Sequence, residues 1–370
     1  MNLSQPDQTN GPDAEKSPSV VVSILNWRGW RDTVECLESV GRLRYANYVT
    51  VVSDNGSDNK SLEELRAWAK AHFREGDAFV EYRREVALAG GDTAREEGLE
   101  RGASGRRLVL VDNAENLGFT GGNNVAIQYA LRRPQPADYV LLLNNDAIVE
   151  RDCLTRLLEA AQVSGAGIVG ALIKDEKSGQ VQFMGRDDAV PLTRQFFHPL
   201  FRLPQAAPDS EKEFQVMSWV SGAAMLIGKG VLQDVYRVRG RYLDDKLFLY
   251  GEDVEFCAIA RRVGYRTVRA NRAVIYHGAA SSSGGQFNPV AYYYLNRNRV
   301  FLASRNLAMP WRGFFHLVNG AVCSGRILKS LAKRRPRAAL AIFRGMVDAY
   351  RGIGGKWRYH DREVQRSLTG

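Results

Sequence analysis

YVLLLNND, the segment Tyr139–Asp146, joins five apolar residues to three polar ones. A short apolar run of this kind is typical of a strand buried inside a parallel sheet. Ligands of open α/β sheets bind just outside the carboxyl ends of the strands, where Asn144, Asn145 and Asp146 would lie. A carboxylate flanked by carboxamides suits a hard divalent cation and the hydroxyls of a ribose. The alternative is a polar turn in which Asp146 caps the following helix.

The rest of the chain repeats this alternation of strand and helix. Strand-like runs occur at 20–25, 49–53, 108–111, 167–173, 223–227 and 273–276, and helical spacing occurs at 30–40, 62–69, 123–133 and 152–163. This order predicts an α/β fold with a mostly parallel, Rossmann-like sheet flanked by helices. We interpret residues 83–107 as an insertion, helical in part, and expect the irregular segment 175–215 to cover a site.

The excess of positive over negative charge lies at the end of the chain. Of 370 residues, 45% are hydrophobic and 25% charged, as in a globular protein. Sixteen Lys and Arg residues but three acidic ones lie between Asn296 and Gly370, whereas residues 1–295 hold 35 basic and 38 acidic residues. This distribution argues against a nucleic-acid partner for the whole surface and predicts a basic helical region at 289–370.

Other features of the sequence indicate the compartment. Residues 1–18 are polar, lack the apolar core of a signal peptide, and are expected to be a disordered leader before a domain at 19–288. No apolar stretch reaches the roughly 18 residues that a transmembrane helix needs. The cysteines are far apart and predict free thiols rather than a disulfide or zinc framework: Cys36, Cys153, Cys257 and Cys323. We therefore expect a cytoplasmic protein.

Two further polar segments follow expected strands. Asp54-Asn55-Gly56-Ser57 ends the second strand and is placed to meet a nucleoside, although an Asx turn would have the same composition. The segment 116–124, NLGFTGGNN, leads into a helix. Its glycines would let the backbone approach a ligand, and a helix N-terminus favours an anionic phosphate. A glycine-rich turn without a ligand is the alternative.

An acidic motif and a histidine occupy comparable positions further along the chain. Asp253 follows a buried segment and falls in the first turn of an expected helix. A partly desolvated carboxylate there would serve as general base for a hydroxyl, or would merely favour the helix dipole. His277 ends the strand-like run at 273–276 beside a loop rich in Gly and Ser. A structural role for this histidine is the alternative to a ligand role.

Together these segments resemble the family 2 glycosyltransferases of the GT-A fold, within them the rhamnosyltransferase-like branch. The resemblance extends from about Val20 to Leu307 and rests on six motifs in the order of the family: SDNGSDN (53–59), ENLGFTGGNN (115–124), LLLNNDA (141–147), WVSGAAMLI (219–227), LFLYGEDVEFC (247–257) and YHGAASS (276–282).

The resemblance implies inverting transfer of a sugar from a nucleotide diphosphate donor to a hydroxyl group. Residues 144–146 stand where the family has its DXD motif, so Asp146, with His277, would hold Mn²⁺ or Mg²⁺, and Asp253 would be the catalytic base. Asn144 replaces the first Asp of that motif. The donor site would comprise Asn26, Asp54, Asn55, Ser57, Asn116, Gly118, Gly121, Asn124, Asn144, Asn145 and Asp146. The acceptor site or the active site would include Trp219, Ser221, Glu252 and Arg297.

The substrates and partners implied are a nucleotide-sugar donor, best matched by dTDP-rhamnose, and a glycan or lipid-linked saccharide acceptor in bacterial surface polysaccharide synthesis. A UDP- or GDP-sugar is the alternative donor. The basic region 289–370, with its interleaved apolar residues, predicts peripheral binding to the anionic inner face of the cytoplasmic membrane, or else a solvated helical face or a homodimer contact.

Two other classes of function fit the sequence less well. A sugar-1-phosphate nucleotidyltransferase would carry a Gly-rich basic loop after the first strand, where this chain has Asn26-Trp27-Arg28-Gly29-Trp30. A non-catalytic membrane- or RNA-binding scaffold would not need the acidic motifs of the near-neutral body.

Overall fold

The computed structural model describes residues 17–101, 107–182, 185–187, 196–197, 211–278 and 288–368. Residues 1–16 of the expected leader and most of the irregular segment 175–215 lie outside the described residues. The body of the molecule contains, in chain order, β1 (Val20–Asn26), α1 (Trp30–Val40), β2 (Tyr48–Asp54), α2 (Ser61–His72), β3 (Phe79–Arg83), α3 (Arg84–Ala89), α4 (Thr93–Arg101), β4 (Leu108–Asp112), α5 (Gly118–Arg132), β5 (Tyr139–Asn144), β6 (Ala147–Val149), α6 (Cys153–Ser164), β7 (Ile168–Asp175), β8 (Gly185–Asp187), β9 (Phe214–Val220), β10 (Ala224–Gly228), α8 (Lys229–Arg239), α9 (Glu252–Arg262) and β11 (Thr267–His277).

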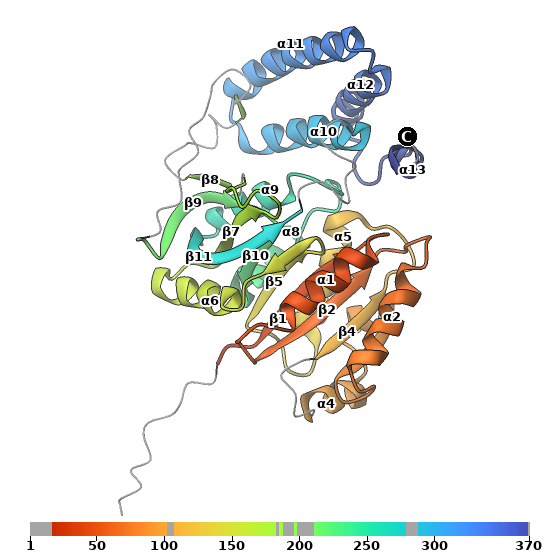
Figure 1. Cartoon of the computed structure of the whole chain (residues 1–370). Helices are drawn as coiled ribbons and strands as arrows, with labels where there is room; N and C mark the ends of the chain where they lie inside the picture. Colours follow the sequence, from red (N-terminus) through yellow and green to blue (C-terminus); the bar gives the residue numbers. More distant parts are fainter. Residues whose placement is uncertain are drawn as a thin grey trace, which may run out of the picture.

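The strands form one sheet with the order β3-β4-β2-β1-β5-β10-β7-β11-β9-β8, and β6 pairs with β11 (Figure 1). From β3 to β5 every pairing is parallel, with β1 between β2 and β5. β10 runs antiparallel between β5 and β7, and β9 runs antiparallel to β11. The predicted α/β architecture is confirmed, with mixed strand directions in the half beyond β5.

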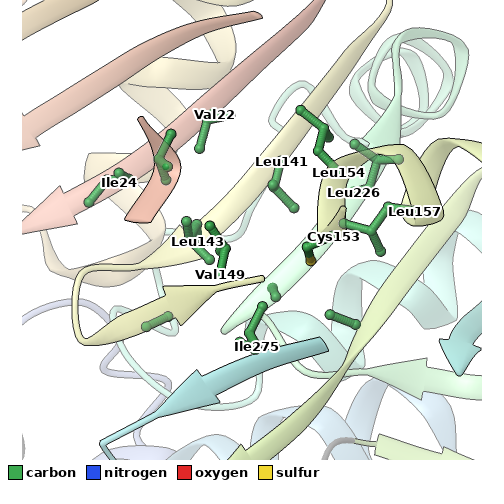
Figure 2. Packing of buried hydrophobic residues seen from close by; sticks show 14 of the residues in the cluster. Val22, Ile24, Leu141, Leu143, Val149, Cys153, Leu154, Leu157, Leu226 and Ile275 are labelled. Carbon is green, nitrogen blue, oxygen red and sulfur yellow. The ribbon is translucent and has the colours of Figure 1, made fainter. Parts of the chain in front are cut away.

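Both faces of the sheet are buried, because its strands consist of apolar, largely β-branched residues. In Figure 2, Val22 and Ile24 of β1 and Leu141 and Leu143 of β5 lie on the same side as Leu157 of α6. The opposite face packs against α5 and α9 through a second cluster that includes Val51 and Phe256. Such double coverage explains why these strands appear as continuous apolar runs rather than alternating patterns.

Several elements differ from the expectation. The helix expected from residue 123 begins at Gly118, and β3 and β9 were not expected. The segment expected to be an insertion forms α3 and α4, and Glu96 of α4 is buried beneath the sheet edge. The hydroxyls of Tyr82 and Tyr129 both donate hydrogen bonds to Glu96, and Arg133 pairs with it, so α4 is anchored to the body.

The remaining helices form a layer at one end of the molecule (Figure 1). They are α10 (Pro289–Asn306), α11 (Trp311–Ala332), α12 (Pro336–Tyr350) and α13 (His360–Leu368). Asn288 caps α10 by accepting from the backbone N–H of Val290, and Pro289 occupies the first turn, where no hydrogen-bond donor is needed. Among the residues that the structure describes, no helix combines the length and apolar character required to cross a membrane.

Candidate functional site

A cavity of about 360 Å³ lies at the carboxyl ends of β1 and β5. Its polar lining includes Asn144, Asn145, Asp146 and His277, and its aromatic lining includes Trp27, Phe119, Phe248, Tyr250 and His360. The lining also contains Leu25, Asn55, Asn116, Gly118, Leu249, Asn288, Val290, Ala291 and Val364. The structure therefore brings residues of the predicted polar motifs at 54–57, 116–124 and 144–146 together with His277 and with residues of α10 and α13 around one cavity.

At the polar end of the cavity, Asp146 and His277 face each other. Asp146 Oδ1 lies 3.1 Å from His277 Nε2, and Asn144 Nδ2 lies 3.1 Å from the same nitrogen. β6, which begins directly after Asp146, pairs with the end of β11, where Ala147 is opposite His277. This pairing brings two residues 131 positions apart in the sequence to one point.

Gln182 sets the tautomer of the His277 ring. Its Nε2 donates to the carbonyl oxygen of His277 at 2.9 Å and to Asp175 at 3.3 Å, which leaves Oε1 to face His277 Nδ1 at 3.2 Å. Nδ1–H therefore donates to Gln182, and the lone pair of Nε2 faces both the Asn144 amide and Asp146 Oδ1. An imidazole lone pair beside a carboxylate oxygen is a donor set that suits a divalent metal ion.

The predicted nucleoside contacts Asn26, Asp54 and Ser57 form a buried network instead of lining the cavity. Asp54 accepts from Asn26 Nδ2 at 2.6 Å, from the Ser57 hydroxyl at 2.7 Å and from the Ser57 backbone N–H at 2.9 Å. Burial raises the pKa of Asp54, and these hydrogen bonds oppose the rise. The network holds the ends of β1 and β2 together, and places Trp27 and Asn55 on the cavity wall.

The glycine-rich segment divides between the cavity and the interior. Asn116 and Gly118 line the cavity, and Asn116 Oδ1 accepts from the backbone N–H of Gly118 at 2.9 Å. Gly118 has φ +72°, and a Cβ there would lie 2.4 Å from the carbonyl oxygen of Phe248, so this close approach requires glycine. Asn124 instead bonds Leu243 and Asp245, and Gly121 packs against Leu117.

Glu252 and Asp253 begin α9 beside the cavity. Asp253 accepts from the backbone N–H of Gly222 at 3.2 Å and from that of Val254 at 2.8 Å. A Cβ at Gly222 would lie 3.3 Å from the Phe119 ring and 3.7 Å from Asp253 Cβ, so Gly222 adjoins both the cavity-lining Phe119 and Asp253, which itself does not line the cavity.

The two carboxyls are chemically distinct. Burial and the neighbouring Asp253 raise the pKa of Glu252 to about 8, and its Oε2 has no hydrogen-bond partner among the described residues. Burial also raises the pKa of Asp253, but two backbone N–H groups stabilise its charged form. Of this adjacent pair, Glu252 therefore retains its proton at neutral pH, whereas Asp253 receives the backbone hydrogen bonds that favour ionisation.

The cavity wall at 247–250 is held in an uncommon conformation. Phe248 and Tyr250 have φ +63° and +69°, which bulky residues rarely adopt. Asn298 Nδ2 lies 2.7–3.0 Å from the carbonyl oxygens of Leu247, Leu249 and Tyr250. Arg297 donates to the carbonyls of Lys246 and Leu247 as well, so α10 clamps this segment.

This geometry places the four expected acceptor-side residues differently. Arg297 is fully buried behind the wall, not in the cavity. Trp219 lies on β9 opposite Arg186, while Ser221 adjoins Gly222 and Glu252 adjoins Asp253. Only Ser221 and Glu252 are thus next to the carboxylate expected to act on an acceptor.

Several residues in or beside the cavity were not expected from the sequence. Gln182, which contacts His277, lies in a segment without periodicity, and His360 lies near the end of the basic region 289–370, so neither had a local signal. Phe248 and Tyr250 lie within the quoted motif at 247–257, and Trp27 directly follows the first strand-like run, but none of the three was named as a site residue.

The sequence matches the family described as "Glycosyltransferase like family 2" over residues 85–291, more than half of the chain. It is 24% identical over 216 residues to the low-salt glycan biosynthesis hexosyltransferase Agl10 of Haloferax volcanii, covering 58% of this chain and 66% of that relative, just under two thirds of its length. It is 28% identical over 205 residues to the rhamnosyltransferase WbbL of Escherichia coli, covering 51% of this chain and 74% of that relative.

A similar fold occurs in a mannosyltransferase from Pyrobaculum calidifontis, solved in complex with GDP-Man and Mn²⁺. The TM-score is 0.51 at 15% identity, and the superposition covers 92% of this chain and 89% of that one. This similarity supports the GT-A fold.

Proposed function

Because the chain belongs to the glycosyltransferase-like family 2, we propose that it is a hexosyltransferase that moves a sugar from a nucleoside diphosphate donor to a hydroxyl group with inversion. The observation that carries this proposal is a cavity whose polar end holds Asp146 and His277. The Asp253 carboxylate lies next to this cavity, because Gly222, whose N–H it accepts, adjoins Phe119 of the cavity wall.

The polar end fits a divalent cation. Asp146 supplies an anionic oxygen, and the imidazole lone pair of His277, oriented by Gln182, faces it. Among the described residues, no group of three His, Cys, Asp or Glu side chains could hold a metal ion, so the donor diphosphate and water would complete the coordination. Bound Mn²⁺ or Mg²⁺ would offset the negative charge that develops on the departing diphosphate.

Asp253 supplies the base. As the acceptor oxygen forms its bond to the anomeric carbon, the bond from that carbon to the diphosphate breaks, and the hydroxyl proton moves to Asp253. Burial raises the pKa of Asp253 toward neutral pH, and a general base is most effective when its pKa lies near the working pH. The backbone N–H of Gly222 positions this carboxylate.

The first donor to test is dTDP-rhamnose, because the similar Escherichia coli protein is named a rhamnosyltransferase. Thermal-shift measurements with dTDP-, UDP- and GDP-sugars, with and without Mn²⁺, would identify the donor. Asp146→Ala should abolish the Mn²⁺-dependent part of the shift, whereas Asp253→Asn should keep the shift and lose at least about 100-fold in turnover. Wild-type-like turnover by Asp253→Asn would remove this residue from the mechanism.

We propose further that the enzyme works at the inner face of a membrane on a lipid-linked saccharide in surface polysaccharide synthesis. Support comes from α11, whose solvent-facing side is apolar. Leu317 is 74% exposed and Leu328 66% exposed, and Phe314 and Leu331 extend the same side. The Lys and Arg residues of α11 (Arg312, Arg326 and Lys329) project at least about 100° around the helix from Leu317 and Leu328.

An anionic lipid surface is the occupant that this side of α11 favours. Lys333, Arg334, Arg335 and Arg337 are all exposed where α11 turns into α12. A dimer formed through this side of α11 would bring positive charges together. In an antiparallel pair, the basic turn of one copy would meet Arg312 and the positive end of the α11 dipole of the other copy, and in a parallel pair the two basic turns would meet. Phosphate head groups complement the turn, and acyl chains complement Leu317 and Leu328.

Vesicle sedimentation tests this surface. Binding to phosphatidylglycerol-containing vesicles should exceed binding to phosphatidylcholine vesicles and fall at least tenfold in Leu317→Glu/Leu328→Glu. Val238→Glu is the control, since Val238 is 65% exposed on α8. Unchanged vesicle binding of the double variant, or self-association that this variant abolishes, would contradict the membrane proposal.

A further inference from the structure

His360, the first residue of α13, projects from the C-terminal layer into the cavity. The side chain is buried, with a relative exposure of 4%, and its ring lies 5.3 Å from both the Trp27 and Phe248 rings. It is a cavity-lining residue, as is Val364 one turn further along α13. The C-terminal region therefore contributes directly to the wall of the proposed donor site.

The hydrogen bonds around His360 define its tautomer. Tyr294 Oη accepts from the backbone N–H of Trp357 at 2.8 Å and lies 3.3 Å from His360 Nδ1. Because Tyr294 is fully buried, its hydroxyl hydrogen needs an acceptor, and Nδ1 is placed to be that acceptor. Burial lowers the pKa of His360 to about 4, so the ring is neutral and its single proton resides on Nε2.

His360 Nε2 is buried and has no hydrogen-bond partner among the described residues. A buried donor without an acceptor is costly, and the great majority of such groups in proteins are paired. Here the donor belongs to a ring that lines a cavity, so an oxygen of a bound ligand is the missing partner.

We propose that His360 Nε2–H donates a hydrogen bond to a base carbonyl oxygen of the nucleotide donor, so that α13 completes the nucleoside subsite. This inference rests on the proposed function. The rings of Trp27 and Phe248, which both contact His360 and line the cavity, offer apolar surface for a planar base. The diphosphate, by contrast, suits the Asp146 and His277 end, where a cation fits.

The proposal can be tested with His360→Phe, which keeps a ring but removes the donor, and His360→Gln, whose amide nitrogen can replace Nε2–H. Calorimetric titration with dTDP, UDP and GDP in the presence of Mn²⁺ should show a five- to tenfold weaker Kd for His360→Phe and recovery to within about twofold for His360→Gln. Mn²⁺–pyrophosphate, which lacks a base, should bind all variants equally. His72→Phe, on the exposed end of α2, is the control.

The ¹⁵N resonance of His360 Nε2 in the wild-type protein provides a second measurement, which does not depend on folding of the variants. It should start at the protonated-nitrogen position and shift when nucleotide is added. Wild-type affinity of folded His360→Phe, an equal loss of pyrophosphate binding, or an unmoved resonance at saturating nucleotide would overturn the inference. Failure of the wild-type protein to bind any of the three nucleotides would instead reject the proposed function.

Discussion

Arg297→Lys tests whether Arg297 of α10 holds the cavity wall at 247–250 in place or instead contacts an acceptor. We call the hydrogen bonds from Arg297 and Asn298 to this wall the α10 clamp. The guanidinium donates to Gly355 O at 2.6 Å, Leu247 O at 2.8 Å, Lys246 O at 2.9 Å and Asn298 Oδ1 at 2.9 Å. Lysine keeps the charge but cannot place donors in this planar fork. The substitution therefore preserves electrostatics while removing the geometry that holds the cavity wall.

The expected loss follows from the bonds that lysine cannot make. If two of the four are lost, at roughly 2 kcal/mol for each bond to a charged donor, the free energy of unfolding falls by about 4 kcal/mol. For a chain of this length, that loss corresponds to a fall in Tm of about 5 °C. The donor KM should also rise, because Phe248 and Tyr250 need the clamp to keep their positive φ angles.

Thermal denaturation and donor titration together provide the assay. Arg272→Lys, at an exposed position of β11, is the matched control and should leave Tm unchanged. A Tm for Arg297→Lys equal to that of the wild type would refute the clamp. A normal Tm with a raised KM for the acceptor alone would restore the role predicted from the sequence.

Two substitutions test other parts of the site. Because the pKa of Glu252 is raised in the folded protein, the free energy of unfolding of the wild type falls as pH rises from 4.5 to about 8. Glu252→Gln should therefore increase the free energy of unfolding by about 3 kcal/mol at pH 7 and leave it unchanged below pH 4.5. Urea denaturation across this range would show no pH-dependent gain if Glu252 were ionised. Gly118→Ala places Cβ 2.4 Å from Phe248 O and should cost roughly 2 kcal/mol and weaken nucleotide binding. Gly165→Ala, with φ +63° and no atom within 4 Å, is its control and should cost only about 1 kcal/mol without affecting the ligand; equal losses would show that the close approach is unimportant.

The local pattern was sufficient for the framework of the molecule. Buried strands need continuous apolar, β-branched residues, so β1, β2, β4 and β5 were recognisable from short windows of sequence. Polar residues directly after these strands were expected at one edge of the sheet. Asn144, Asp146 and His277 do line one cavity there, because strand ends converge in an open α/β sheet.

The sequence could not predict which group each polar side chain hydrogen-bonds, because these partners are distant in the chain. Asn26, Asp54 and Ser57 satisfy one another in the interior, and Arg297 satisfies backbone carbonyls instead of facing a substrate. No short window distinguishes these arrangements, because a buried polar group can be satisfied by any neighbour that the fold supplies.

Gln182 and His360 also take their positions from contacts between distant parts of the chain, which is why neither was expected at the site. Local sequence established a GT-A framework, its acidic motifs and a basic helical end. Only the tertiary structure placed Gln182 against His277 and brought α13 back over the end of β1, where His360 meets Trp27. Backbone hydrogen bonding and burial specify strands and helices locally, whereas the lining of a cavity is specified by packing between elements remote in the chain.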